Sequence, residues 1–188
     1  VLKDFFLAGS ELCGKRILIT AGPTYEKIDP VRFIGNYSSG KMGFAIAAEC
    51  ARRGADVTLV AGPVSLDTPH PSIKRIDVES AREMCDAAVE AFPSCDAAVL
   101  SAAVADYRPA VQASSKIKRT AGGMTIDLEA NPDIAATLGK AKREGQCLAG
   151  FALETNNAEE NARLKLEKKN LDFIVLNSLE DKGAGFSC

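Results

Sequence analysis

The stretch from Arg32 to Gly43, reading RFIGNYSSGKMG, carries the residue types best suited to binding an anion. Ser38, Ser39 and Gly40 offer hydroxyls and unpaired backbone N–H groups at an expected helix start, where the helix dipole is positive. Gly40 and Gly43 would let a phosphate or another backbone approach closely. The residues therefore predict a phosphate site, with a Gly/Ser turn that merely caps a helix as the alternative.

The connection that carries this stretch is unusually long. Residues 22–38 separate an expected strand from an expected helix, where roughly 2–6 residues are usual. Long loops in compact domains tend to be functional, which favours the binding site over the simple cap. Arg32 and Asn36 lie on this connection, and we expect both at the mouth of the same site.

Two familiar motifs match the stretch by coincidence. Gly35 to Lys41 fits the P-loop pattern, but Met42 follows where a P-loop needs a hydroxyl for magnesium. Tyr37 and Lys41 have the Tyr-x-x-x-Lys spacing of short-chain dehydrogenases, although that pair belongs on a mid-chain helix. Neither match indicates a function.

The elements that must position these residues alternate between strand and helix. Strands are expected at 16–21, 56–61, 73–78, 97–101, 124–128, 147–151 and 173–176, and helices at 42–53, 80–91, 131–142 and 158–169. Asn131 is expected to cap its helix, with Pro132 as the first helical residue. The alternation predicts an α/β fold: a Rossmann-like, mostly parallel sheet with helices on both faces and ligands at the C-terminal strand ends.

Charged residues after these strands give three further candidates. Asp106 could hold a ribose, a base edge or a metal, or could be a loop cap or surface acid. Lys116 to Arg119 reads as a mobile basic flap that closes on phosphates, or as a solvated charge run. Lys165 and Lys169, four apart on one helix face, could clamp a phosphate or be ordinary solvated lysines.

Composition limits the class of protein. The chain has 188 residues, 46% hydrophobic and 26% charged, which suits one globular domain. Its net charge of −2 and pI near 5.6 leave no basic footprint for nucleic acid, and no apolar run reaches the length of a membrane span. Six cysteines without C-x-x-C spacing predict reduced thiols, with no disulfide and no zinc. The one histidine, His70, lies in an expected surface loop, so histidine-based catalysis is not expected.

Together the motifs resemble a known family, the phosphopantothenoylcysteine synthetase domain of bacterial coenzyme A biosynthesis. The resembling segments, in the family's order, are ITAGPT, DPVRFIGNYSSGKMGFAIA, GADVTLVAGPVSL, SAAVADYRP, KIKR, ANPDI, GFALETNN and KKNLDFIVLN. The resemblance implies a ligase that joins 4′-phosphopantothenate to L-cysteine. CTP would give an acyl-cytidylate and pyrophosphate, and cysteine would then displace CMP. CTP and Mg²⁺ are the implied cofactors, with the metal ligands left unassigned.

The resemblance also assigns residues to roles. Asn36, Arg32 and Lys116 are the implied catalytic residues, and the helix start is the implied phosphate contact. The implied CTP site consists of Ala102, Asp106, Lys116, Pro132, Asp133, Ile134, Ala135, Phe151, Lys165 and Lys169.

The resemblance further implies how the chain is organised. Residues 1–15 look like a linker, and 16–188 look like the synthetase domain without its C-terminal end. The family is usually fused to a flavin-dependent phosphopantothenoylcysteine decarboxylase and is cytoplasmic. An extended flap and dimerisation excursion is expected around residues 108–130, with strand 124–128 near the contact of a homodimer. Lys116 to Arg119, here called the basic tract, ends in Lys-Arg where the family usually has Lys-Lys.

Two other functions are alternatives to the ligase. An NAD(P)-dependent reductase lacks support, because the chain has no G-x-G-x-x-G and has Gly62 and Pro63 where an acid should follow the second strand. A nucleotide-binding regulatory module on the same fold is the non-enzymatic alternative, since a fold does not fix a function.

Overall fold

The computed structural model describes residues 11–119, 121–154 and 157–178. Along the chain, the strands of the main sheet are β1 (Arg16–Ala21), β4 (Asp56–Ala61), β5 (Lys74–Asp77), β6 (Ala97–Leu100), β9 (Cys147–Glu154) and β10 (Phe173–Ser178). The helices are α2 (Lys41–Arg52), α3 (Ala81–Ala91), α4 (Ile134–Ala141) and α5 (Ala158–Lys168), with a short 3₁₀ turn, η1, at Phe92–Ser94. Two small hairpins, β2 (Tyr25–Lys27) with β3 (Phe33–Gly35) and β7 (Tyr107–Pro109) with β8 (Leu128–Ala130), complete the described elements.

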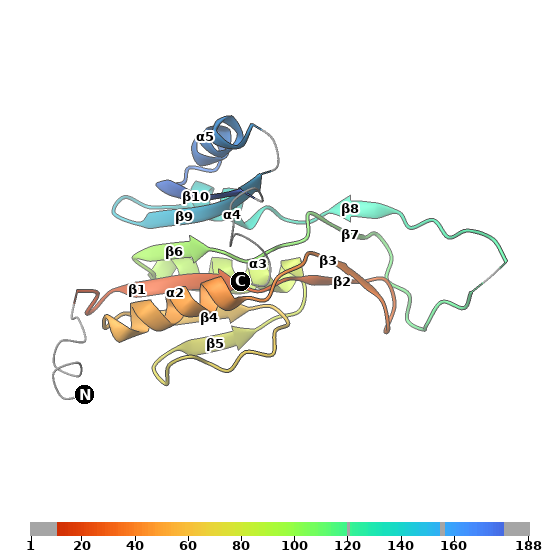
Figure 1. The fold of residues 1–188 in the computed structure, drawn as a ribbon, viewed down its shortest axis with the longest axis horizontal. Helices are drawn as coiled ribbons and strands as arrows, with labels where there is room; N and C mark the ends of the chain where they lie inside the picture. Colours follow the sequence, from red (N-terminus) through yellow and green to blue (C-terminus); the bar gives the residue numbers. More distant parts are fainter. Residues whose placement is uncertain (1–10, 120, 155–156, 179–188) are drawn as a thin grey trace.

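The six strands of the main sheet are all parallel and lie in the order β10-β9-β6-β1-β4-β5 (Figure 1). The chain starts in the middle at β1, moves outward to β5, and then returns to the other side of β1 with β6. The strand order therefore reverses between β1 and β6, and such a switch point is where doubly wound sheets bind their ligands, at the carboxyl ends of the strands.

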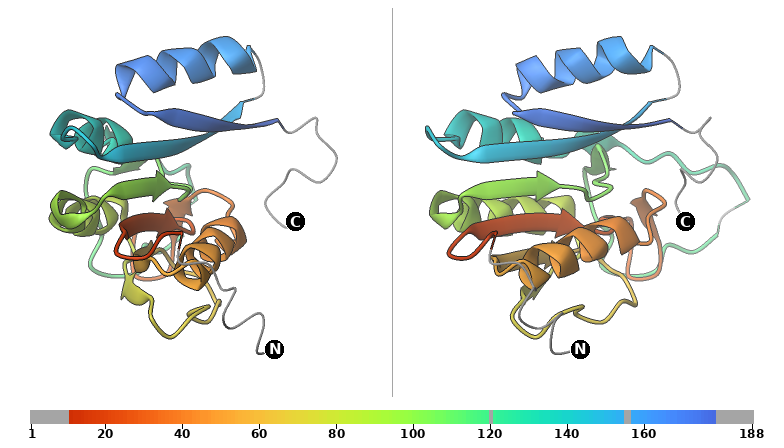
Figure 2. Two further views of the ribbon diagram at one scale, coloured as in Figure 1. Left: turned by 90° about the vertical axis from the view of Figure 1, so that its left-hand side faces the viewer. Right: turned by 60° about the vertical axis from the view of Figure 1, so that its left-hand side comes forward.

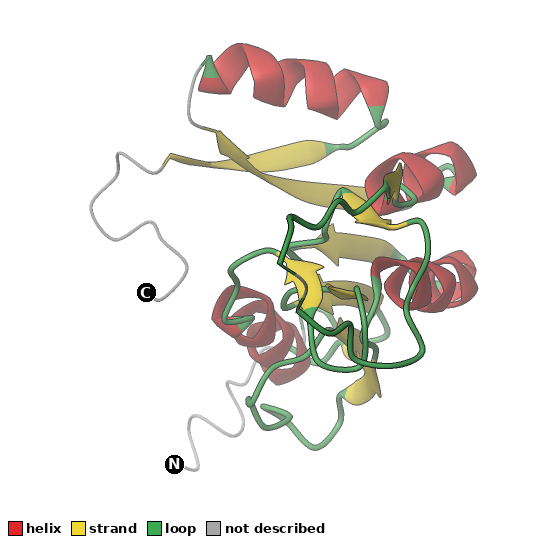
Figure 3. Ribbon diagram, turned by 90° about the vertical axis from the view of Figure 1, so that its right-hand side faces the viewer, coloured by secondary structure: helices red, strands yellow, loops and turns green. Residues whose placement is uncertain are grey.

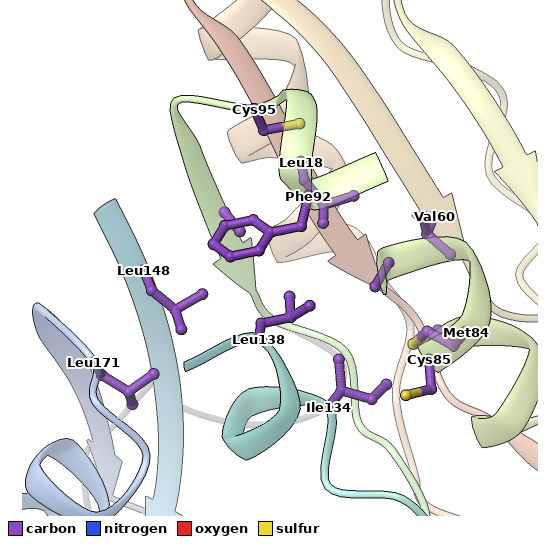
Figure 4. Close-up of a cluster of buried hydrophobic side chains, with 12 residues drawn as sticks. Leu18, Val60, Met84, Cys85, Phe92, Cys95, Ile134, Leu138, Leu148 and Leu171 are labelled. Carbon is purple, nitrogen blue, oxygen red and sulfur yellow. The ribbon is translucent and has the colours of Figure 1, made fainter. Parts of the chain in front are cut away.

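Helices cover the two faces of this sheet (Figure 2). The core on one face packs α2, through Phe44, Ala47 and Ala51, against Ile17 and Ile19 of β1. The core on the other face joins α3 and α4 to the sheet and contains Leu18, Met84, Phe92, Leu138 and Leu148 (Figure 4). Helix α5 packs along β9 and β10 at one edge. Successive side chains of β1 therefore point alternately into the two cores.

An extension leaves the sheet from the ends of β1 and β6. The antiparallel β2–β3 hairpin lies within the connection before α2, and β7 pairs antiparallel with β8 from Tyr107↔Ala130 to Pro109↔Leu128. The connection between β7 and β8, of which residues 110–119 and 121–127 are described, is here called the excursion loop. Figure 3 views the molecule from this end and shows the loop in front of the sheet.

The predicted fold class is confirmed, and six of the seven predicted strands match strands of the main sheet. The predicted strand at 124–128 is wrong. Strand β8 begins at Leu128, because only Leu128 to Ala130 pair with β7. Alternation of apolar and polar residues cannot show whether a neighbouring strand exists.

The predicted start of the helix at 131–142 is also wrong. Asp133, not Asn131, is the N-cap of α4, and its Oδ1 accepts from the Ala136 N–H at 2.9 Å. Asn131 instead donates its side-chain amide to the Ala105 carbonyl at 2.8 Å. Both residue types cap helices, so the tertiary contact decides between them. Over the described part of the chain, no helix is long and apolar enough to cross a membrane.

Candidate functional site

An open pocket of about 730 Å³ lies at the carboxyl ends of β6 and β9 and beside the start of α2. Its volume is in the range typical of small-molecule sites. The described residues that line it are Gly35, Asn36, Tyr37, Ser38, Ser39, Gly40, Lys41, Met42, Gly43, Ser101, Ala102, Ala103, Val104, Asp106, Phe151, Ala152 and Lys165. The pocket thus occupies the switch point at which this sheet order predicts a ligand.

The start of α2 forms one wall of the pocket. Gly40 is the N-cap with φ 75°, a left-handed conformation that favours glycine, and no side-chain cap is found among the described residues. The Gly40 N–H donates to Ser38 Oγ at 3.3 Å. Gly43 lies so close to the sheet that an added Cβ would come 2.5 Å from Ala21 Cβ and from Ser101 Oγ. The helix start is therefore pressed against the strand ends with its N–H groups at the pocket.

The loop after β6 forms the second wall, and three side chains hold it. Asn36 Nδ2 donates to the Val104 carbonyl at 2.9 Å, and the buried Thr24 hydroxyl accepts from the Ala105 N–H at 3.0 Å. The side-chain amide of Asn131 also donates to the Ala105 carbonyl, and its backbone N–H donates to the Asp106 carbonyl at 2.8 Å. These contacts fix the backbone that carries Asp106 into the pocket.

Opposite charges face the pocket from three elements. Lys41 comes from the first turn of α2, Lys165 from α5, and Asp106 from the loop after β6. Lys41 and Lys165 both make contacts within the protein. Two ammonium groups and a helix N-terminus favour an anionic ligand, while Asp106 can accept from its hydroxyl or amide groups.

Nine of the residues predicted from the sequence lie in the pocket lining. They are Asn36, Ser38, Ser39, Gly40, Gly43, Ala102, Asp106, Phe151 and Lys165.

Arg32 is not in the described lining, contrary to the expectation that it shares the pocket mouth. Its guanidinium donates to the buried carboxylate of Asp29, with 3.0 Å from Nε to Oδ2, and Nη2 also donates to the Ile117 carbonyl at 2.7 Å. The sequence placed Arg32 on the correct loop but could not show which way its side chain turns.

The other predicted residues lie outside the described lining as well. Lys116 is exposed on the excursion loop. Pro132, Asp133, Ile134 and Ala135 form the start of α4, and Ile134 is buried in the core. Lys169 Nζ lies 3.0 Å from Asp133 Oδ2, so it links α4 to the end of α5. Burial acts to raise the pKa of Asp133, but the Ala136 N–H and Lys169 outweigh it and leave that pKa below its ordinary value. That these residues belong to a functional site stays a prediction.

Several important residues were missed at the sequence level. Lys41 was noticed only as part of two coincidental motifs, although a basic residue directly after a glycine cap was a usable signal. Asp29 was not singled out, because its importance depends on burial and on a partner 88 residues away, Ile117. Among the described residues, no group of three or more His, Cys, Asp or Glu side chains could hold a metal ion.

The fold and this pocket define a class: a Rossmann-like α/β domain with an anion-binding small-molecule pocket at the switch point of its sheet. The chain belongs to the family described as "DNA/pantothenate metabolism flavoprotein C-terminal domain", whose sequence model matches residues 12–188.

Curated relatives agree with this membership. A protein named cysteine/cysteine sulfinic acid decarboxylase, from an unknown prokaryotic organism, is 58% identical over 93% of this chain and 49% of its own length. The coenzyme A biosynthesis bifunctional protein CoaBC of Vibrio parahaemolyticus is 50% identical over 99% of this chain and 47% of its own length, and that of Escherichia coli is 52% identical over 91% and 43%. The chain spans about half the length of these relatives.

Solved structures confirm the fold. The C-terminal domain of a CoaBC protein superposes with a TM-score of 0.78 at 49% identity, covering 88% of this chain and 78% of that one. The DNA/pantothenate metabolism flavoprotein from Streptococcus pneumoniae also gives 0.78, at 26% identity, covering 88% and 83%.

These names correct the predictions about activity. The synthetase family and the CTP-dependent ligase reaction were expected, but the family description names a flavoprotein and the 58% identical relative is named a decarboxylase. The ligase, CTP, nucleotide-binding and magnesium assignments are therefore withdrawn. So is the partner set of 4′-phosphopantothenate, L-cysteine, CTP and a fused decarboxylase. The physical reason is that lysines and a helix start predict an anion without specifying which anion, or which reaction follows.

The Rossmann-like fold is the part of the resemblance that the comparisons confirm. The division into a linker at 1–15 and a domain at 16–188 stays a prediction, as does the homodimer.

Proposed function

We propose that this domain serves coenzyme A biosynthesis by binding 4′-phosphopantothenoylcysteine, a phosphorylated ligand that ends in a cysteinyl carboxylate. The observation that carries the proposal is the position of Lys41 and Lys165 in one pocket with the uncapped start of α2. A ligand with anionic groups at both of its ends suits a pocket with more than one cationic feature.

The names of relatives narrow the choice of anion. Several relatives are named coenzyme A biosynthesis proteins, and the relative named a decarboxylase acts on cysteine or cysteine sulfinic acid by its name. A structure with the same fold, TM-score 0.73 at 16% identity, is described as a complex with phosphopantothenate-cysteine. That likeness supports the fold alone. The proposed ligand is instead the compound that combines the pantothenate of the family description with the cysteine of the relative's name.

The family description names a flavoprotein, but the described lining of the pocket does not suit a flavin. Lining residues between the charged groups are mainly glycine, serine and alanine. Of the two aromatic residues in the described lining, Tyr37 is 83% exposed. These walls do not provide the flat apolar slot that holds an isoalloxazine ring, so no flavin step is assigned to the described residues.

The contribution of the described residues is therefore to bind and orient the ligand. Asp106 would accept hydrogen bonds from hydroxyl or amide groups of the pantothenoyl chain, and Phe151 and Val104 would cover its methylene groups. A cytoplasmic location stays a prediction.

Isothermal titration calorimetry with 4′-phosphopantothenoylcysteine tests the proposal. Binding should weaken at least about tenfold for the dephosphorylated compound, because each charge-assisted hydrogen bond is worth roughly 1.5–3 kcal/mol. Release of CO₂ from the same compound, with and without added FMN, tests separately whether the relative's named reaction occurs. Equal affinity for the phosphorylated and dephosphorylated ligands would overturn the proposal.

A further inference from the structure

Asp29 is a fully buried carboxylate in the turn of the β2–β3 hairpin. Its Oδ1 accepts from the N–H groups of Val31 and Arg32, at 2.9 and 3.0 Å, and these bonds shape the turn. Its Oδ2 accepts from the Arg32 guanidinium and from the Ile117 N–H, the latter at 3.1 Å. Oδ1 therefore accepts only within the hairpin turn, whereas Oδ2 also binds the excursion loop.

Ile117 is held through both of its backbone groups. Its N–H donates to Asp29 Oδ2, and its carbonyl accepts from Arg32 Nη2 at 2.7 Å. The pair of bonds joins residues 85 and 88 positions apart in the chain. Such bonds to charged groups are about twice as strong as neutral ones.

Charged residues surround this contact on the excursion loop. Lys116, Lys118 and Arg119 are exposed, while Ile117 between them is partly buried. A second bond, from the Ala113 N–H to the Ile28 carbonyl at 2.9 Å, also joins the loop to the hairpin turn. The basic tract is thus fixed at its centre, four residues beyond the other attachment.

We propose that Asp29 and Arg32 are positioning residues that hold the excursion loop at Ile117 and so fix where the cations of the basic tract lie. Because the holding bonds reach backbone groups, the device does not depend on the side chain at position 117. It is also independent of the ligand proposed for the pocket.

Asp29→Asn separates the two functions of the carboxylate. The amide oxygen can replace Oδ1 and keep accepting from Val31 and Arg32. The NH₂ group would stand in the place of Oδ2, where it cannot accept from the guanidinium or from Ile117. Arg32→Lys is a milder variant, because a single ammonium cannot span Asp29 and the Ile117 carbonyl as the guanidinium fork does.

Residue-resolved amide hydrogen exchange on the full chain tests the proposal. In Asp29→Asn the Ile117 amide should exchange at least about tenfold faster than in the wild type, since the bond from its N–H is lost. Ala113 is the internal reference and should exchange as before. Arg32→Lys should give a smaller increase, because Asp29 still accepts from Ile117. Trypsin should cut after Lys118 faster in both variants.

Asp67→Asn, an exposed carboxylate in the loop after β4, is the matched control and should change neither measurement. Thermal unfolding establishes that each variant is folded, and Arg32→Lys carries the test if Asp29→Asn is not. An Ile117 amide that exchanges at the wild-type rate in the folded variants would overturn the proposal. Equal acceleration at Ala113 and Ile117 would also overturn it, because it would indicate general loosening of the loop.

Discussion

The side-chain amide of Asn36 donates to the backbone carbonyl of Val104, with 2.9 Å between Nδ2 and O. This bond joins the connection before α2 to the loop after β6, the two walls of the pocket. The resemblance had given Asn36 a catalytic role, whereas the structure gives it a partner on the opposite wall. One hydrogen of the amide is used there, and the other can serve a ligand.

Replacing Asn36 by Asp should weaken binding of 4′-phosphopantothenoylcysteine by about tenfold or more. The change removes the donor to Val104 and places a carboxylate against a carbonyl and beside an anionic ligand. Calorimetry on Asn36→Asp and Asn36→Ala separates the causes, since Ala removes the donor without adding charge. Affinity in Asn36→Asp equal to the wild type would show that Asn36 is only a loop residue.

Lys41→Ala and Lys165→Ala should each reduce affinity for the phosphorylated ligand by about tenfold. The lysine that binds the phosphate is the one whose replacement changes affinity for the dephosphorylated ligand much less. Lys140→Ala, an exposed lysine on α4, is the matched control. Titration at two salt concentrations adds a second readout, because the loss of a cation should weaken the salt dependence of binding. Unchanged affinity in both variants would place the anion elsewhere.

The sheet was predictable from the sequence because each buried strand is a short apolar run followed by an amphipathic helix. Arg16 to Ala21 and Asp56 to Ala61 were predicted with their observed bounds. The β2–β3 hairpin was missed, because its three-residue strands carry no periodicity that stands out from a loop. Strand order also requires tertiary information, which local patterns lack.

The pocket was partly predictable for a similar reason. Glycines and serines at a helix start, such as Ser38 and Gly40, reveal a site through local chemistry alone. Arg32 shows the limit, since its partner Ile117 lies 85 residues away. A sequence shows that an arginine is available but not whether a buried carboxylate such as Asp29 already engages it.

The contribution of Asp29 to the stability of the protein should change with pH only in the acidic range. The Arg32 guanidinium, together with backbone N–H groups and despite burial, holds the pKa of Asp29 well below its ordinary value of 3.8. A depressed folded-state pKa gives stability that is complete above the unfolded-state pKa and is lost as the pH falls through the folded-state pKa. The wild type should therefore exceed Asp29→Asn in free energy of unfolding by a constant amount from pH 5 to 7, and by less below about pH 4.

Urea unfolding of both proteins at pH 3, 4, 5 and 7 measures this difference. Because the other carboxylates titrate alike in the two proteins, the difference between the two free energies of unfolding isolates the contribution of Asp29. A difference that stays constant down to pH 3 would mean that the carboxylate charge does not contribute, and a difference that grows in acid would reverse the expected sign.

Gly43→Ala should destabilise the contact between α2 and the sheet. An added Cβ would lie 2.5 Å from both Ala21 Cβ and Ser101 Oγ, closer than such atoms can approach, so the helix or the strand ends must move. Overpacking of this kind costs about 1–3 kcal/mol. For a domain of this size the melting temperature should fall by roughly 2–12 °C. Because the helix start lines the pocket, affinity for 4′-phosphopantothenoylcysteine should fall with it.

Gly122→Ala is the matched control, since an added Cβ there meets no described atom within 4 Å. Its melting temperature should stay within about 2 °C of the wild type, as expected for a surface substitution of less than about 0.5 kcal/mol. Calorimetry of unfolding and of ligand binding on both variants checks the prediction. A Gly43→Ala protein as stable as the control would mean that α2 can shift from β1 without cost. Retained affinity despite lower stability would show that the ligand does not touch the helix start.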